Sequence, residues 1–190
     1  MHVPGPFRVD DSAALYEFVQ KYNFGQLVSQ VEGRLFSTHL PFLFDKDRQT
    51  LTCHLARANP QWREIESQEV MVTFQGPHGY ISPSWYTGPG VPTWNYQVVH
   101  AYGACRLLNE NEVHHLLHEL TEYHESQIAS SWQVDYDPSM LKAIVGLEIS
   151  VSEFQGKFKL SQNRSASDRQ GVMENLSSPD LLEAMKHEGH

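Results

Sequence analysis

The first regular pattern in the chain is a helical repeat of apolar residues near the N-terminus. Its members lie three and four residues apart and share one helical face: Leu15, Phe18, Val19 and Tyr22. Asp11 stands just before this repeat, where its carboxylate can accept hydrogen bonds from the first backbone N–H groups of a helix. The pattern predicts a helix that begins after Asp11 and packs its apolar face on the core.

From Gly25 onward the pattern changes to an alternation of apolar and polar residues, which is typical of half-buried strands. The alternating runs are GQLVSQ, RLFSTHLPFLFD and QTLTCHL. Turn-forming residues separate these runs at Glu32-Gly33 and at positions 45–48. These features predict an antiparallel meander of consecutive strands.

Further strands are predicted by VMVTF, by TWNYQVVHAYGACRLL and by GLEISVSEF, which KFKL extends beyond Gly156. Residues 76–96, between the first two of these runs, contain four Gly, four Pro and five aromatic residues. Such a composition predicts rigid, irregular loops that display flat side chains.

Four further segments predict helices. Asn59-Pro60 combines a cap with a first-turn proline and begins a short helix that runs to about Glu66. A longer helix over 112–128 has one apolar face, formed by Val113, Leu116, Leu117, Leu120 and Ile128. Asp137-Pro138 begins another short helix, and Ser178-Pro179-Asp180 begins a C-terminal helix with Leu181, Leu182 and Met185 on its face. We expect one domain over 1–177 and a helical tail over 178–190.

Length and charge narrow the class of protein. A chain of 190 residues with 40% hydrophobic residues is long enough for one core. Its 14 basic and 23 acidic residues give a formal charge of −9, which argues against a broad DNA-binding face. The sequence has no run of eighteen apolar residues, no signal-peptide pattern and no metal-like cysteine spacing. We therefore expect a cytoplasmic protein with no membrane span and no metal site.

The stretch from Val70 through Cys105 contains no Asp, Glu, Lys or Arg. It includes flat apolar side chains and neutral hydrogen-bonding groups: Trp85, Tyr86, Trp94, Ser82, Thr93 and Asn95. A planar ligand with polar edges needs a pocket of this composition. A loop-rich aromatic core or a subunit interface suits it equally well.

Two cationic segments are candidates for binding an anion. Arg57 precedes the helix start at Asn59-Pro60, where a guanidinium and free backbone N–H groups could hold a phosphate. The alternative is an ordinary strand-to-helix turn with a solvent-facing arginine. Lys157 and Lys159 fall on one side of a strand, where two ammonium groups repel unless an anion lies between them. The alternative there is an edge strand guarded by lysines.

Several motifs in this order resemble the PaiB family of FMN-binding split-barrel proteins. They are STHLPF, HLARANPQW, GPHGYISPSWY, VPTWNY, the Val99-His100 pair and GKFKLSQNR. The resemblance extends from the N-terminus to about Asn175. It implies a mainly β fold with flanking helices, namely a six-stranded Greek-key barrel like that of pyridoxamine-phosphate oxidase. It also implies a homodimer that binds FMN between its subunits.

The resemblance also implies roles for particular residues. Arg57 and Asn59 are expected to hold the FMN phosphate, with Lys157 and Lys159 as helpers. The flavin ring is expected near Thr38, His39, Ser82, Trp85, Trp94 and Asn95. No catalytic acid or base is identified.

Members of the PaiB family are described as negative transcriptional regulators of protease production and sporulation. The sequence has no defensible helix-turn-helix motif and its charge of −9 disfavours direct contact with DNA, so indirect regulation through a flavin state or a protein partner is the expected route. A small FMN-dependent oxidoreductase is the alternative. A third hypothesis is heme binding through the histidine-rich helix or through His187 and His190.

Overall fold

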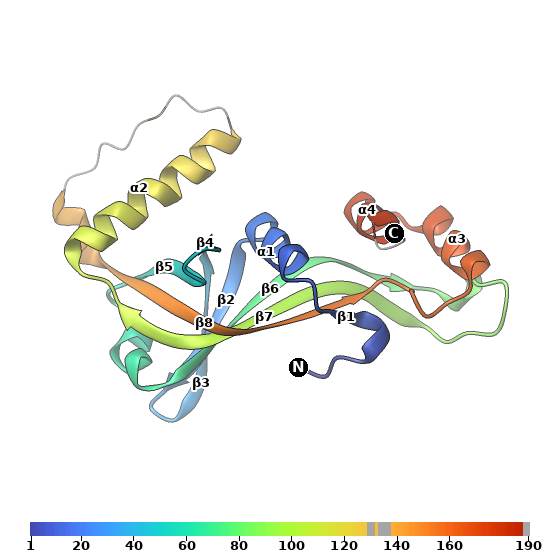
Figure 1. The fold of residues 1–190 in the computed structure, drawn as a ribbon, viewed down its shortest axis with the longest axis horizontal. Coiled ribbons are helices and arrows are strands. Elements are labelled where there is room, and N and C mark those ends of the chain that lie inside the picture. Colours follow the sequence, from blue (N-terminus) through green and yellow to red (C-terminus); the bar gives the residue numbers. More distant parts are fainter. Residues whose placement is uncertain (129–131, 133–137, 188–190) are drawn as a thin grey trace. The chain divides into compact units, whose positions relative to one another are not determined.

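The computed structural model describes residues 1–128, 132 and 138–187. Within them, eight strands form one sheet in the order β3-β2-β6-β7-β8-β5-β4, and β1 pairs with β8 (Figure 1). The strands are β1 (Arg8–Val9), β2 (Phe24–Val31), β3 (Arg34–Pro41), β4 (Leu43–Asp45), β5 (Thr50–Ala56), β6 (Glu69–Ile81), β7 (Thr93–Leu107) and β8 (Ile144–Lys159). The α-helices are α1 (Ser12–Lys21), α2 (Glu110–Gln127), α3 (Ala166–Asn175) and α4 (Pro179–His187). Short 3-10 helices are η1 (Gly5–Phe7), η2 (Pro60–Arg63), η3 (Ile65–Ser67), η4 (Pro83–Trp85) and η5 (Pro138–Ala143).

The prediction of an antiparallel meander is correct for two hairpins and wrong for the other strand neighbours. β2 and β3 form one antiparallel hairpin, and β4 and β5 form another. The second neighbour of β2 is β6, however, and the second neighbour of β5 is β8. Alternation along a strand indicates which face is buried, but it does not indicate the partner strand. Non-consecutive neighbours of this kind are typical of Greek-key sheets.

The chain divides into two compact units. The barrel unit comprises Val19–Phe74 and Ala101–Phe154. The terminal unit comprises Met1–Phe18, Gln75–His100 and Gln155–His190. The three longest strands, β6, β7 and β8, each contribute residues to both units.

The barrel unit has a tightly packed apolar core. The rings of Phe42 and Phe74 meet edge to face with centroids 5.5 Å apart. Around them lie other fully buried side chains: Leu27, Leu51, Leu55, Leu147 and Ile149. Burying one such side chain stabilises a fold by roughly 1.5–3 kcal/mol relative to exposing it.

Helix α2 follows the predicted amphipathic pattern over most of its length. Asn109 and Glu112 form a capping box at its start, which satisfies orphaned backbone N–H groups. Val113, Leu116 and Leu120 are buried. Ile128 was assigned to the same face, but it lies beyond the last helical residue and is 72% exposed.

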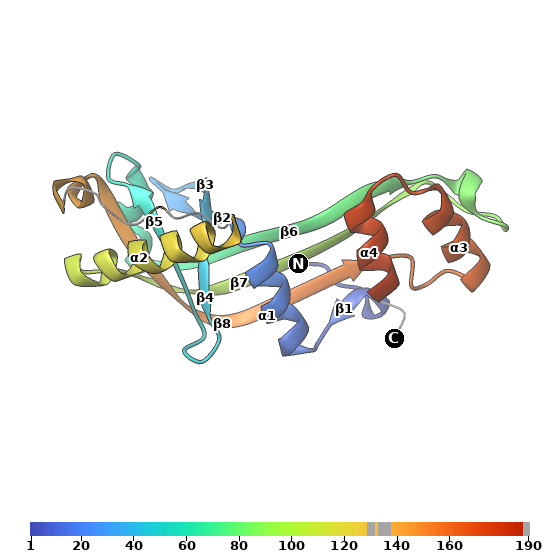
Figure 2. The ribbon, with the colours of Figure 1, turned by 90° about the horizontal axis from the view of Figure 1, so that it is seen from above.

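The terminal unit contains α3 and α4, which lie beside the end of the β6–β7 hairpin in both ribbon views (Figures 1 and 2). Leu181 and Met185 of α4 are completely buried, as the sequence predicts for that helix. At the N-terminal end of the unit, the Phe18 ring packs on that of Phe158 with centroids 5.0 Å apart.

Two features of the terminal unit differ from the sequence prediction. Residues 76–81 continue β6 as a regular strand, so the irregular segment is confined to positions 82–92. Helix α3 was not predicted, although Ser165 and Asp168 have the spacing of an N-terminal cap.

The turn between β2 and β3 depends on glycine. Glu32 has φ 51° and Gly33 has φ 74°, so both central residues are left-handed, as a two-residue type I′ hairpin turn requires. We expect Gly33→Ala to destabilise the fold by about 1 kcal/mol, because a Cβ disfavours this conformation. Urea denaturation measures the change, with Gly5→Ala as the control at a glycine without positive φ. Equal stability of the two variants would contradict the prediction.

Candidate functional site

A chain of polar side chains connects three segments of the barrel unit. The Asn59 side-chain amide donates to the Thr38 hydroxyl at 2.9 Å, and this hydroxyl donates to the side-chain oxygen Oε1 of Gln61 at 2.7 Å. Gln61 is fully buried, and its amide donates to the Ser29 hydroxyl and to the Leu27 carbonyl. The structure therefore brings together Thr38 and Asn59, two of the predicted site residues. Gln61, which links them to β2, is not among the predicted residues.

Arg57 is exposed, but its guanidinium is held in place. Its Nε donates to the Lys142 carbonyl at 2.7 Å, and its Nη2 donates to the Ile144 carbonyl at 2.8 Å. The guanidinium also lies over the Trp62 ring, 5.8 Å from the centroid. A guanidinium has five N–H donors, so these two bonds leave three that can be offered to an anion. The fixed orientation lowers the entropy cost of binding one.

The helix start beside Arg57 differs from the expectation in one respect. Pro60 begins a 3-10 helix of four residues, and the Asn59 side chain accepts a hydrogen bond from the Gln61 N–H. That N–H is thus already bound within the protein and is not a free donor for phosphate. His39, on the neighbouring strand β3, is exposed and stacks with Phe24 at 6.2 Å.

The terminal unit has an exposed aromatic cluster on β6 and β7. The Trp94 ring lies 5.6 Å from the His78 ring and 6.4 Å from the Tyr80 ring. Trp94 and Tyr80 remain about half exposed, at 51% and 49%. Large aromatic faces that stay open to solvent in this way can stack with a planar ligand.

Lys157 and Lys159 belong to the part of β8 that lies in the terminal unit. They precede and follow the buried Phe158 in the sequence and so share one face of the strand. The Lys157 ammonium lies over the Tyr96 ring at 5.2 Å. The Lys159 ammonium donates to the Thr93 hydroxyl and, at 2.8 Å, to the Trp94 carbonyl. Burial and the nearby charges of Lys157 and Arg164 lower the pKa of Lys159. An anion at this position would relieve that repulsion.

The remaining predicted residues have structural partners. Ser82 caps η4 through the Ser84 N–H, and Trp85 is the half-buried last residue of η4. Asn95 is completely buried, and its amide bonds the Ser161 hydroxyl and the Met185 sulfur. Its side chain is therefore hydrogen-bonded within the protein, to Ser161 and to Met185 of α4.

The histidines and cysteines offer no obvious reactive centre among the described residues. His115 and His118 of α2 pair with glutamates one turn later, at 3.2 and 3.4 Å. His187 is exposed and lies 3.8 Å from Glu183, while His190 falls outside the described residues. Burial raises the pKa of Cys105 to about 12 and that of Cys53 well above its usual value, so both thiols stay protonated.

The described residues contain neither a cluster of three or more metal-ligating side chains nor a helix long and apolar enough to span a membrane.

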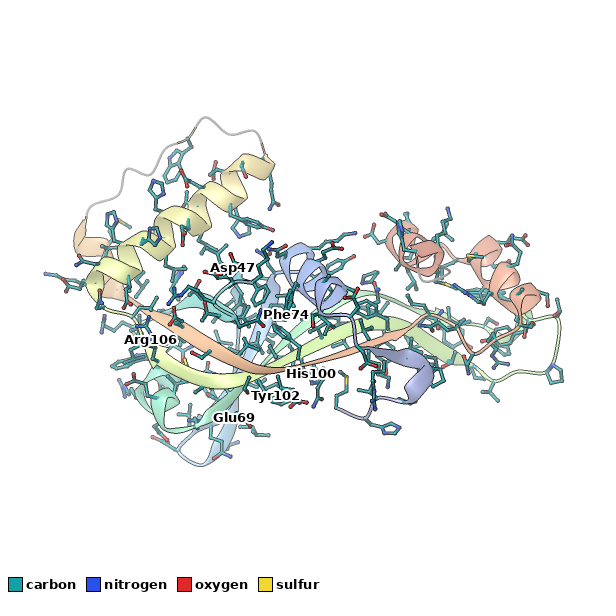
Figure 3. All side chains as sticks on the ribbon, in the orientation of Figure 1. Asp47, Glu69, Phe74, His100, Tyr102 and Arg106 are labelled. Carbon is teal, nitrogen blue, oxygen red and sulfur yellow. The ribbon has the colours of Figure 1, made fainter. Side chains whose placement is uncertain are left out.

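A network of charged side chains ties α2 to the sheet of the barrel unit (Figure 3). Arg106 of β7 donates to the buried Glu148 of β8 at 2.8 Å and to Glu112 of α2 at 2.8 and 3.1 Å. Arg48 lies 3.2 Å from the other Glu148 oxygen. The hydrogen bonds from Arg106 lower the pKa of Glu112. This network stabilises the fold and belongs to no predicted site.

Comparison with known proteins identifies relatives over nearly the full length. A family model described as "Putative FMN-binding domain" matches residues 1–153. The "Protease synthase and sporulation protein PAI 2" of Bacillus subtilis (strain 168) is 40% identical over 188 residues, which cover 95% of this chain and 91% of that protein. An uncharacterized protein of Emericella nidulans is 30% identical over 217 residues and covers 86% of each chain.

Solved structures with low sequence identity share the fold. The FAD and heme binding protein of Mycobacterium smegmatis has a TM-score of 0.68 at 12% identity and covers 91% of this chain and 89% of its own. The flavocytochrome Anf3 of Azotobacter vinelandii has a TM-score of 0.67 at 14% identity, with coverages of 83% and 72%. A "Putative Pyridoxamine 5'-phosphate oxidase" of Listeria innocua has a TM-score of 0.50 at 16% identity, with coverages of 76% and 95%.

These likenesses define the class as a split barrel of the pyridoxamine-phosphate-oxidase type, mainly antiparallel β with flanking helices. The relatives in sequence then narrow the class. The chain belongs to the PaiB family of FMN-binding split-barrel proteins, and its FMN-binding domain spans residues 1–153. The fold, family and cofactor inferred from the motifs are thereby confirmed.

Proposed function

We propose that this protein is a PaiB-type regulator that binds FMN, forms a homodimer and carries the flavin site at the dimer interface. The observation that carries the proposal is the fixed, exposed Arg57 guanidinium in a chain whose FMN-binding domain covers residues 1–153. The regulatory part follows the Bacillus subtilis relative, whose name refers to protease synthesis and sporulation.

The phosphate of FMN is assigned to Arg57 and Asn59, with Lys157 and Lys159 as helpers. A phosphate dianion leaves water only when charged donors replace its hydration. Arg57 has three N–H donors beyond its two carbonyl bonds, and Lys159 is a partly desolvated cation with cationic neighbours. These side chains therefore fit a phosphate chemically.

The flavin ring is assigned to Thr38, His39, Ser82, Trp85 and Trp94. The open Trp94 face and neutral hydroxyl groups fit a planar ring with polar edges. Asn95 is assigned to the same site in a positioning role, because its side chain is buried and bonds Ser161 and Met185. When bound, FMN supplies redox chemistry, while the protein sets its orientation and electrostatic surroundings.

Homodimer formation is supported by two exposed apolar side chains of the β2–β3 hairpin and by a groove beside one of them. Leu35 is 80% exposed and Phe24 is 64% exposed. Leu35 also lines an open groove of about 420 Å³, together with Val28, Met71 and Tyr102. Glu69 and Tyr102, which also line this groove, are labelled in Figure 3. Exposed apolar surface of this kind is typical of interaction sites.

We expect Leu35→Asp to convert the dimer to a monomer, because a carboxylate cannot be buried unpaired at an apolar interface. Light scattering should give twice the chain mass of 21.7 kDa for the native protein and the single chain mass for the variant. Ile128→Asp, at an exposed apolar residue after α2 and outside the assigned site, is the matched control and should stay dimeric. A monomeric native protein would remove the shared site.

The direct test of cofactor binding is the visible spectrum of the purified protein before and after FMN is added and the excess is removed. Retained flavin absorbance is the expected result. Absence of a chromophore in both samples would overturn FMN binding, and a heme band would favour the heme hypothesis instead.

Regulation and catalysis are separated by two further measurements on the FMN-loaded protein. Gel-shift and pull-down experiments test for a DNA or protein partner, and the charge of −9 favours a protein. Stopped-flow mixing with NADH or NADPH tests the second candidate function, a small oxidoreductase. The open aromatic surface at Trp94 favours that candidate. We propose a cytoplasmic location, in keeping with two free cysteines.

A further inference from the structure

The segment that follows Trp85 is tied to helix α3 by a buried carboxylate. Asp168 of α3 is only 7% exposed. Its Oδ1 accepts hydrogen bonds from the Thr87 N–H at 2.9 Å and from the Thr87 hydroxyl at 3.0 Å. Ser165 caps α3 by accepting from the Asp168 N–H at 3.1 Å, which fixes the position of Asp168 in the first turn.

A second contact holds the next part of the same segment. The Arg164 guanidinium lies 4.3 Å from the centroid of the Tyr86 ring, and it donates to the Pro89 carbonyl at 3.5 Å. Gly90 packs so closely on Tyr86 that a Cβ at position 90 would lie 2.3 Å from the ring. Residues 86–90 therefore form a tight turn around one aromatic ring beneath a cation.

A third contact joins backbone to backbone. A Cβ at Gly171 of α3 would lie 2.1 Å from the Trp85 carbonyl oxygen, so only glycine permits this approach. Asp168, Arg164 and Gly171 thus hold Thr87, Tyr86 and Trp85 at three separate points. All six residues belong to the terminal unit. Arg164, Asp168 and Gly171 lie beyond residue 153, where the match to the family model ends.

We propose that α3 and the residue that precedes its cap act as a clamp that positions residues 85–90 as a wall of the ligand site, with Asp168 as the main positioning residue. This inference rests on the proposed function for its assignment of Trp85 to the flavin ring. The clamp acts on the ring and not on the phosphate, because each of its contacts is made to the segment that contains Trp85. Loosening the clamp should weaken the binding of FMN and the binding of riboflavin by the same factor.

The test compares Asp168→Ala and the milder Thr87→Val with the native full-length protein. Asp180→Ala, at an exposed acid in the first turn of α4, is the matched control. Hydrogen exchange of the amides of residues 86–88 and 90 reports the clamp, and exchange of the Leu27 amide in β2 reports the fold. Titrations with FMN and with riboflavin report the site.

In Asp168→Ala we expect the Thr87 amide to exchange at least about tenfold faster, because it loses a charge-assisted hydrogen bond. FMN and riboflavin should both bind roughly three- to tenfold more weakly, by the same factor. Thr87→Val keeps the backbone bond and loses only the hydroxyl bond, so its effects should be smaller and in the same direction. Exchange at Leu27 should be unchanged in every variant.

Each other outcome overturns a defined part of the proposal. Unchanged exchange in Asp168→Ala would overturn the clamp. Faster exchange with unchanged flavin affinities would leave a structural contact only and overturn the positioning role. A loss confined to FMN would overturn the assignment to the ring. A native protein that binds neither flavin would overturn the proposed function, and with it the positioning role, while the exchange rates still decide on the clamp.

Discussion

Replacing Arg57 with alanine is expected to weaken FMN binding by about 1.5–3 kcal/mol, a roughly 10- to 150-fold rise in Kd, and to leave the affinity for riboflavin nearly unchanged. The loss corresponds to a charge-assisted hydrogen bond to the phosphate, which riboflavin lacks. Isothermal titration with both ligands measures the difference.

Arg63→Ala is the matched control for this prediction. Arg63 also lies over the Trp62 ring, at 5.9 Å, and it is exposed like Arg57. The Arg63→Ala variant should therefore lose the contact with the Trp62 ring and keep the native affinity for FMN. An equal loss for FMN and riboflavin in Arg57→Ala would show that Arg57 acts by holding the Lys142 and Ile144 carbonyls and does not contact the phosphate.

Replacing Arg106 with alanine is expected to destabilise the fold by about 1.5–3 kcal/mol at neutral pH. Glu148 is 6% exposed and would keep Arg48 as its remaining cation, so the cost stays below that of a fully unpaired buried charge. For a chain of this size the melting temperature should fall by roughly 3–12 °C. Arg34→Ala, at the exposed β2–β3 turn, should leave it unchanged.

The same network predicts a dependence on pH. The pKa of Glu112 is lowered in the folded protein from its usual 4.5, so the unfolded chain binds the proton more readily. The stabilisation is therefore fully present above about pH 4.5 and is lost as the pH falls through the lower folded value. The difference in melting temperature between native protein and Arg106→Ala should narrow in that range. A constant difference down to pH 2 would assign the effect to packing of the Arg106 side chain.

A regulatory protein that binds a redox cofactor can couple its regulatory activity to the redox state of its flavin. The residues that surround the flavin ring set that coupling. The residues proposed to surround the ring include no acid, lysine or arginine, and the cations assigned to the site from β8 are Lys157 and Lys159. Fixed positive charge stabilises an anionic reduced ring, so substitutions at these lysines are the means to shift the potential of the bound flavin without removing it.

The sequence by itself was sufficient for most of the local structure and for the family. Helix α1, the first three turns of α2, and α4 follow from apolar residues at helical spacing, since one buried face suffices to specify an amphipathic helix. The hairpin turn at Glu32-Gly33 follows from its residue types. The motifs around Arg57, Trp85 and Lys157 identified an FMN-binding split barrel before any geometry was known.

Only the tertiary structure decided which distant segments meet. The pairings of β2 with β6 and of β5 with β8 depend on long-range packing, which alternation along a strand does not encode. The same holds for the Arg57 bonds to carbonyls more than 80 residues away and for the burial of Asn95 beneath α4. Helix α3 has almost no amphipathic pattern, so periodicity does not predict it. Besides the buried Val172, its contacts are the Ser165 cap, the bonds of Asp168 and the close approach of Gly171. Interactions of this kind are made by single atoms at fixed positions, and those positions exist only once the chain has folded.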